Sequence, residues 1–171
     1  RQRRNGYWRG QFLIGRKDGM GNFSVLSANH TSFTVSDLDR TTAFFSEALG
    51  FKVLSKAPRD AKVIQNVTGV KGADIIVAYV EGPGGHRVEL IEYLSPADRE
   101  KVESRPCDTG FAHVAYDVDD VEAAVAASAD YGFSPLGAPV GIDKGPNTGA
   151  HVVYLRDQDG VTVEFIGKPG A

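Results

Sequence analysis

The sequence has little of what marks a secreted, membrane-spanning or nucleic-acid-binding protein. Its 171 residues include a single cysteine, Cys107, so no internal disulfide can form. No apolar run approaches the roughly 20 residues of a membrane span. The 19 basic and 22 acidic residues give a formal net charge of −3 and form no block of one sign, which argues against nucleic acid or a membrane surface as the partner. We therefore expect a small-molecule substrate and a cytoplasmic location.

The N-terminal segment is basic but is not typical of a signal peptide. Its apolar stretch FLI is far shorter than the roughly 7 to 15 residues of a signal-peptide core. The only methionine is Met20. We interpret residues 1–27 as an extension outside the fold, either foreign to the natural chain or disordered. The hydrophobic content of 42% is enough for one good core or two small cores joined together.

The remaining sequence contains an internal repeat. The segment HTSFTVSDLDRTTAFFSEALGF begins at His30, and HVAYDVDDVEAAVAASADYGF begins at His113, 83 residues later. Each has a strand-like start, an aspartate able to cap a helix, and a glycine followed by phenylalanine at its end. Later in each half, RVELIEY and TVEFIGK also correspond, which aligns Glu89 with Glu164. The two halves are therefore expected to fold alike.

Further strand-like segments complete each half. They are FKVLSKA and ADIIVAYV in the first half and FSPLGAP and AHVVYLRD in the second. A short helix is expected at RDAKVIQNV. The sequence thus predicts an α+β fold of two tandem βαβββ modules that form a cupped mixed sheet. The first module spans 28–94, a polar linker 95–109, and the second module 110–168.

Two histidines and two glutamates are predicted to face away from the core. Side chains alternate faces along a strand, so Val88 and Leu90 point to the core while Glu89 points to the opposite, concave face. The same alternation applies to the other three residues. An ionised carboxylate in an apolar strand needs a partner, and two imidazoles with two carboxylates suit a divalent transition metal. The candidate ligands are His30, Glu89, His113 and Glu164.

Two nearby polar residues are expected to be solvated instead. Glu92 has no acidic counterpart in the second half, where Gly167 stands at the equivalent position. His86 lies in the turn GPGGH. Neither is assigned to the metal.

These segments together resemble the vicinal oxygen chelate superfamily, which includes glyoxalase I, methylmalonyl-CoA epimerase, fosfomycin- and bleomycin-resistance proteins and extradiol dioxygenases. The resemblance covers residues 28–168. It implies two paired βαβββ modules around one divalent metal ion, and the four candidate ligands match those of glyoxalase I. The sequence does not distinguish Zn, Ni, Co, Mn and Fe. The resemblance also implies a homodimer, since superfamily members often pair modules across subunits.

The resemblance implies lyase or isomerase chemistry of the glyoxalase I or epimerase type, through a metal-stabilised enediolate. Glu164 corresponds to the catalytic base, and Glu89 would support it. Two alternatives stay open: an extradiol-type ring-cleavage dioxygenase, and a non-catalytic drug-binding resistance protein. The extradiol enzymes use two histidines and one glutamate on iron, so Glu89 would crowd such a site.

The predicted substrate pocket differs from that of glyoxalase I. The arginine and asparagine that hold glutathione there correspond to Thr34 and Tyr93. We therefore expect a small oxygenated substrate with an apolar or aromatic body rather than a glutathione adduct. The residues expected to line the pocket are Thr34, Ile91, Tyr93, Tyr154 and Ile166.

Overall fold

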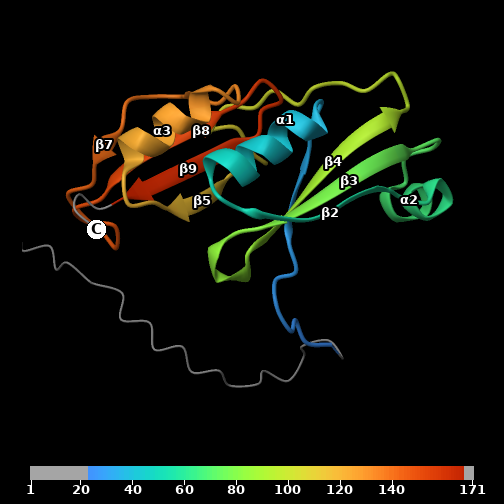
Figure 1. Ribbon diagram of the computed structural model, residues 1–171, viewed down its shortest axis with the longest axis horizontal. Coiled ribbons are helices and arrows are strands. Elements are labelled where there is room, and N and C mark those ends of the chain that lie inside the picture. The colour runs from blue at the N-terminus through green and yellow to red at the C-terminus, as the bar shows by residue number, and fades with distance from the viewer. Residues whose placement is uncertain (1–22, 168–171) are drawn as a thin grey trace, which may run out of the picture.

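The computed structural model describes residues 23–167 and confirms the α+β fold, with two sheets and few helices (Figure 1). Residues 1–22 of the predicted extension and residue 168 of the second predicted module lie outside the described residues. No helix within 23–167 is long and apolar enough to cross a membrane.

The first half of the chain forms a four-stranded sheet in the order β1-β4-β3-β2. Its first strand lies parallel to β4, and the other neighbours are antiparallel. The expected helix after the second strand is present as α2. The elements are β1 (Thr31–Thr34), α1 (Leu38–Ala43), the π-helical segment η1 (Phe44–Ala48), β2 (Lys52–Pro58), α2 (Ala61–Thr68), β3 (Asp74–Glu81), the 3-10 turn η2 (Pro83–Gly85) and β4 (Arg87–Ser95).

The second half repeats this plan with β5 parallel to β9 and the sheet order β5-β9-β8-β6, while β7 also pairs with β8. The predicted strand at FSPLGAP is much shorter than expected: only Ser134–Pro135 pairs with β8 there. Pro135 and Pro139 have no N–H to donate, which interrupts the ladder. The elements are β5 (Val114–Asp117), α3 (Val121–Ala129), β6 (Ser134–Pro135), β7 (Val140–Gly141), β8 (His151–Arg156) and β9 (Thr162–Gly167).

The helix boundaries follow from local chemistry that the repeat predicts. The carboxylates of Asp37 and Asp120 accept the N–H groups of Arg40 and Ala123 in the first turns of α1 and α3. After each helix the chain turns through a glycine with positive φ, Gly50 at 70° and Gly132 at 83°, a conformation that side chains disfavour. In each module, an aspartate thus caps the start of the helix, and a glycine turns the chain after the helical segment ends.

The core is shared between the two halves. Phe44 and Phe45 are both fully buried in η1. Phe44 stacks on Phe133 with ring centroids 3.8 Å apart, and Phe51 meets the edge of Tyr116 at 5.3 Å. In Figure 1, α1 lies between the two sheets, with β2, β3 and β4 on one side and β5, β8 and β9 on the other. Aromatic contacts therefore hold the modules in one arrangement.

A charged cluster reinforces this arrangement at the start of α1. Arg40 Nη2 lies 3.2 Å from Asp157 Oδ2 and 3.0 Å from Asp159 Oδ2, in the turn between β8 and β9. Ser36 donates to Asp159 from its N–H (2.8 Å) and its hydroxyl (2.6 Å). The Asp157 side chain is fully buried, and burial raises the pKa of this carboxyl. The guanidinium is the cation that compensates its charge.

Replacing Arg40 by alanine should therefore destabilise the fold strongly. Removal of one partner from a buried pair leaves an uncompensated charge, and we expect a loss of about 3 kcal/mol in the free energy of unfolding. The matched control is Arg87→Ala, which removes the exposed pair with Glu81 and should cost less than about 1 kcal/mol. Urea unfolding measures both. Equal losses would show that the cluster does not hold the modules together.

Candidate functional site

The first histidine–glutamate pair forms at the N-terminal edge of the first sheet. His30 immediately precedes β1, and Glu89 lies in the neighbouring β4, opposite Ser32 in the parallel register. His30 Nε2 is 3.2 Å from Glu89 Oε2, and the two side chains are 31% and 16% exposed. Val88 and Leu90 on either side are fully buried, so Glu89 occupies the face away from the core. The structure thus brings together two of the predicted ligands.

The second pair has the same construction. His113 precedes β5, and Glu164 lies in β9 between the fully buried Val163 and Phe165. His113 Nε2 is 3.0 Å from Glu164 Oε2, with side-chain exposures of 32% and 16%. The near-identical distances and exposures show that the sequence repeat extends to the placement of these side chains.

The tautomer of His30 suits metal ligation. Its Nδ1 lies 2.8 Å from Asn29 Oδ1. An amide oxygen can only accept, so Nδ1 carries a proton and donates it. Nε2 then faces the Glu89 carboxylate at 3.2 Å. Fixing one ring nitrogen by such a bond is how proteins orient a metal-binding imidazole.

A tyrosine from the adjacent strand completes each pair. The Tyr79 hydroxyl donates to Glu89 Oε1 at 2.5 Å. Burial, followed by the bond to Glu89, raises the pKa of Tyr79 to about 12, so the phenol keeps its proton at neutral pH. The Tyr154 hydroxyl lies 3.3 Å from His113 Nε2, and burial raises its pKa as well.

Tyr154 was predicted as pocket lining, whereas Tyr79 was missed. A signal for Tyr79 exists, because the offset of 75 residues that aligns Glu89 with Glu164 also aligns Tyr79 with Tyr154. Both tyrosines stand directly opposite their glutamates in the antiparallel registers of β3 with β4 and β8 with β9. Extending the repeat comparison to these strands would have found it.

The two pairs do not converge within one chain. Among residues 23–167, no three histidine, cysteine, aspartate or glutamate side chains lie close enough together to hold one ion. Each module therefore presents half of the predicted set of four ligands.

Two predicted pocket residues line a cavity at the far end of the first sheet from His30. Thr34 and Tyr93 line one side of a cavity of about 360 Å³, and linker residues Arg99 to Val102 line another side. Ile91 lies between Glu89 and Tyr93 on the same strand face, and Ile166 lies two residues beyond Glu164. At about 3.3 Å per residue, Tyr93 is roughly 13 Å along the strand from Glu89.

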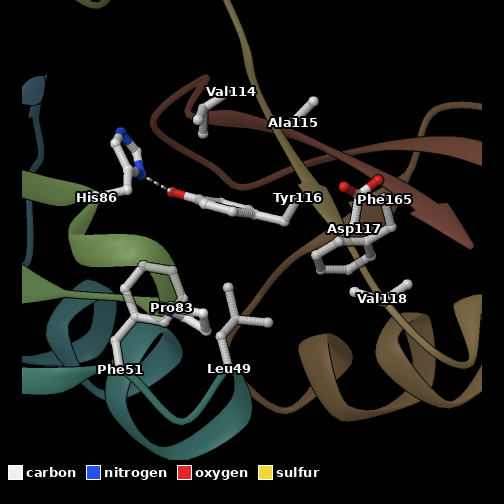
Figure 2. A pocket seen from close by; sticks show the side chains of 10 residues that line it. All are labelled: Leu49, Phe51, Pro83, His86, Val114, Ala115, Tyr116, Asp117, Val118 and Phe165. Carbon is white, nitrogen blue, oxygen red and sulfur yellow. Dashed lines mark hydrogen bonds between the residues drawn. The ribbon is translucent and has the colours of Figure 1, made fainter. Parts of the chain in front are cut away.

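The expectation that His86 is solvated is wrong. His86 lines a second cavity of about 420 Å³ between the modules (Figure 2). Its Nδ1 lies 3.5 Å from the Tyr116 hydroxyl and its Nε2 3.0 Å from Thr31 Oγ1. His86 therefore links strands β1 and β5 of the two modules. Packing of the 3-10 turn against the second module, which no local pattern reveals, places it there.

The prediction for Glu92 also needs correction. Glu92 Oε2 accepts the N–H of Leu38, the first residue of α1, at 3.0 Å, and the residue is partly buried. A carboxylate at a helix N-terminus satisfies a free donor and interacts favourably with the helix dipole. Glu92 is thus a structural acid, on the strand face opposite Glu89.

The chain matches a known protein superfamily over most of its length. Residues 27–165 match the Glyoxalase/Bleomycin resistance protein/Dioxygenase superfamily, and the chain belongs to that superfamily. The sequence is 30% identical over 155 residues to a 2-epi-5-epi-valiolone epimerase from Actinomyces sp, covering 88% of this chain and 84% of the relative. It is 27% identical to a probable lactoylglutathione lyase from Vibrio cholerae, covering 86% and 92%.

Solved structures share the fold. A glyoxalase family protein from Bacillus cereus superposes with a TM-score of 0.75 at 24% identity, covering 88% of this chain and 99% of that one. The fosfomycin resistance protein FosX from Listeria monocytogenes, complexed with Mn(II) and sulfate, superposes with a TM-score of 0.55 at 14% identity, covering 84% and 93%. The predicted superfamily and fold are confirmed.

Glu89 and Glu92 should respond differently to the same substitution. Glu89→Gln removes a charged oxygen from the half-site and should lower bound metal per chain after purification in a defined divalent-ion buffer, as measured by elemental analysis. Glu92→Gln should leave metal content unchanged and cost about 1 kcal/mol of stability, because it weakens the bond to Leu38 N. Equal metal loss in both variants, or in neither, would contradict the assignment of the two strand faces.

Proposed function

We propose that this protein is a metal-dependent lyase or isomerase that transfers a proton at a carbon next to a carbonyl, with epimerisation as the favoured reaction. The observation that carries this proposal is the repeated histidine–glutamate pair, with Nε2 to carboxylate distances of 3.2 and 3.0 Å. Relatives named as an epimerase and as a lactoylglutathione lyase support it.

The residues fit a divalent transition metal. His30, Glu89, His113 and Glu164 offer two imidazole nitrogens and two carboxylate oxygens, a donor set that suits Mn, Fe, Co, Ni or Zn. The bond from His30 Nδ1 to Asn29 leaves Nε2 as the free donor atom. When bound, such an ion supplies Lewis acidity that favours ionisation of the C–H bond beside a carbonyl.

We propose further that each complete site forms between two copies of the chain. The stack of Phe44 on Phe133 and the ion pairs of Arg40 hold the modules of one chain in an arrangement that keeps the two half-sites apart. His30 and His113 precede β1 and β5, which are edge strands of their sheets, and about a third of each imidazole side chain is exposed. In a homodimer, the His30–Glu89 pair of one chain would meet the His113–Glu164 pair of the second chain. This arrangement accounts both for the separation of the two pairs within one chain and for the exposure of their imidazoles.

In this site Glu164 is the proton acceptor. As the C–H bond breaks, its electron pair moves toward the carbonyl and the proton passes to a carboxylate oxygen of Glu164. A water molecule then gives a proton to the opposite face of the same carbon, and Glu164 releases the abstracted proton to solvent, so that the carbon is inverted and the substrate is epimerised. Glu89 stays in place as a supporting carboxylate. Ile91 and Ile166 each lie two residues beyond a glutamate on the same strand face and give the site an apolar wall.

The residues at two positions favour a small carbonyl compound over a glutathione adduct. Thr34 and Tyr93 stand where the resemblance places the arginine and asparagine that hold glutathione, and neither side chain carries a guanidinium or an amide group. An extradiol dioxygenase is less well supported, because Tyr79 holds Glu89 at a position where such a site needs room for catechol and oxygen. A drug-binding role would not require either half-site.

Exchange of substrate hydrogen with solvent tests this function. The metal-loaded protein should catalyse deuterium incorporation from D₂O at the carbon beside the carbonyl of a polyhydroxylated cyclic ketone, followed by NMR. Glu164→Gln should reduce the exchange rate at least about 100-fold, the usual contribution of a general base. Glu122→Gln, which alters an exposed acid of α3, is the control and should exchange as the wild type does. Exchange that persists in Glu164→Gln would contradict the assigned base.

A further inference from the structure

The two glutamates of the half-sites are held differently, although the repeat places them alike. Both carboxylate oxygens of Glu89 have partners: Oε1 accepts from the Tyr79 hydroxyl at 2.5 Å, and Oε2 faces His30 Nε2 at 3.2 Å. Tyr79 stands directly opposite Glu89 in the register of β3 with β4. The carboxylate is therefore held from two sides, by Tyr79 of β3 and by His30, the residue just before β1.

Glu164 lacks the second support. Tyr154 occupies the equivalent register position opposite Glu164, but its hydroxyl lies 3.3 Å from His113 Nε2 instead. Within the described residues, the only hydrogen-bonding partner of the Glu164 carboxylate is His113, at 3.0 Å. The same pair of residue types, tyrosine opposite glutamate, thus produces a fixed carboxylate in one module and a less constrained one in the other.

We infer that Tyr79 is a positioning residue that fixes Glu89 as a permanent metal ligand, so that Glu164 is the carboxylate free to move and transfer the proton. The inference rests on the proposed function and assigns Tyr79 a role within the same site. Tyr79 acts through Glu89 and does not itself touch the reacting carbon. A partner that orients a ligand from outside typically changes metal affinity 10- to 100-fold when it is removed.

The test uses Co(II) as the probe, with titration of the full-length metal-free protein followed by visible absorption. Tyr79→Phe removes only the hydroxyl and should weaken Co(II) binding about 10- to 100-fold, with a changed absorption spectrum because Glu89 is no longer held in one orientation. Tyr131→Phe is the matched control, since it removes the same hydroxyl from a tyrosine that donates to a different glutamate, Glu47, at 3.0 Å. It should alter the affinity by less than about threefold, because neither Tyr131 nor Glu47 belongs to a half-site.

A double-mutant cycle separates positioning from general loss of structure. In the Glu89→Gln background, Tyr79→Phe should change Co(II) affinity less than about twofold, because the carboxylate through which Tyr79 acts is gone. Wild-type affinity in Tyr79→Phe, an equal loss in Tyr131→Phe, or the full loss repeated in the Glu89→Gln background would overturn the inference. Failure of the wild-type protein to bind Co(II) at all would instead remove the proposed metal function, and the role of Tyr79 with it.

Discussion

A carboxylate set among buried apolar residues needs a polar partner, and this need shapes both halves of the molecule. Glu89 and Glu164 each stand between two fully buried side chains on the last strand of a module. In each module a histidine just before the parallel edge strand supplies the partner, at 3.2 or 3.0 Å. The parallel pairing of the first and last strands makes this meeting possible, because it brings residues far apart in sequence to the same end of the sheet.

The packing of the modules then determines what these pairs can do. Phe44, Phe133 and the Arg40 cluster join the core-facing sides of the two halves, which directs the histidine–glutamate pairs away from that shared core. Stability and site geometry are thus linked, since the contacts that make one core from two modules also keep the half-sites apart. In the dimer proposed above, four ligands on one ion would therefore come from two chains.

The repeat made much of this architecture predictable. Strand alternation around Val88 and Leu90 was enough to place Glu89 on the open face, and matched positions did the same for Glu164 and both histidines. Features that depend on contacts between the modules or between helix and strand were not predictable: His86 meets Tyr116 through the packing of a turn, and Glu92 meets Leu38 through the docking of α1. Tyr79 differs from both, because the repeat does predict it: Tyr79 aligns with Tyr154 at the same offset of 75 residues that aligns Glu89 with Glu164.

The measurement that tests shared sites most directly is metal binding by mixed dimers. One variant carries His30→Ala with Glu89→Gln, the other His113→Ala with Glu164→Gln, and neither should retain metal alone. When the two are co-refolded in equal amounts, half of the dimers are mixed and each mixed dimer has one intact site. The mixture should therefore recover about one quarter of the wild-type metal per chain. No recovered metal, in a mixture shown by differential tagging to contain mixed dimers, would contradict a site built from two chains.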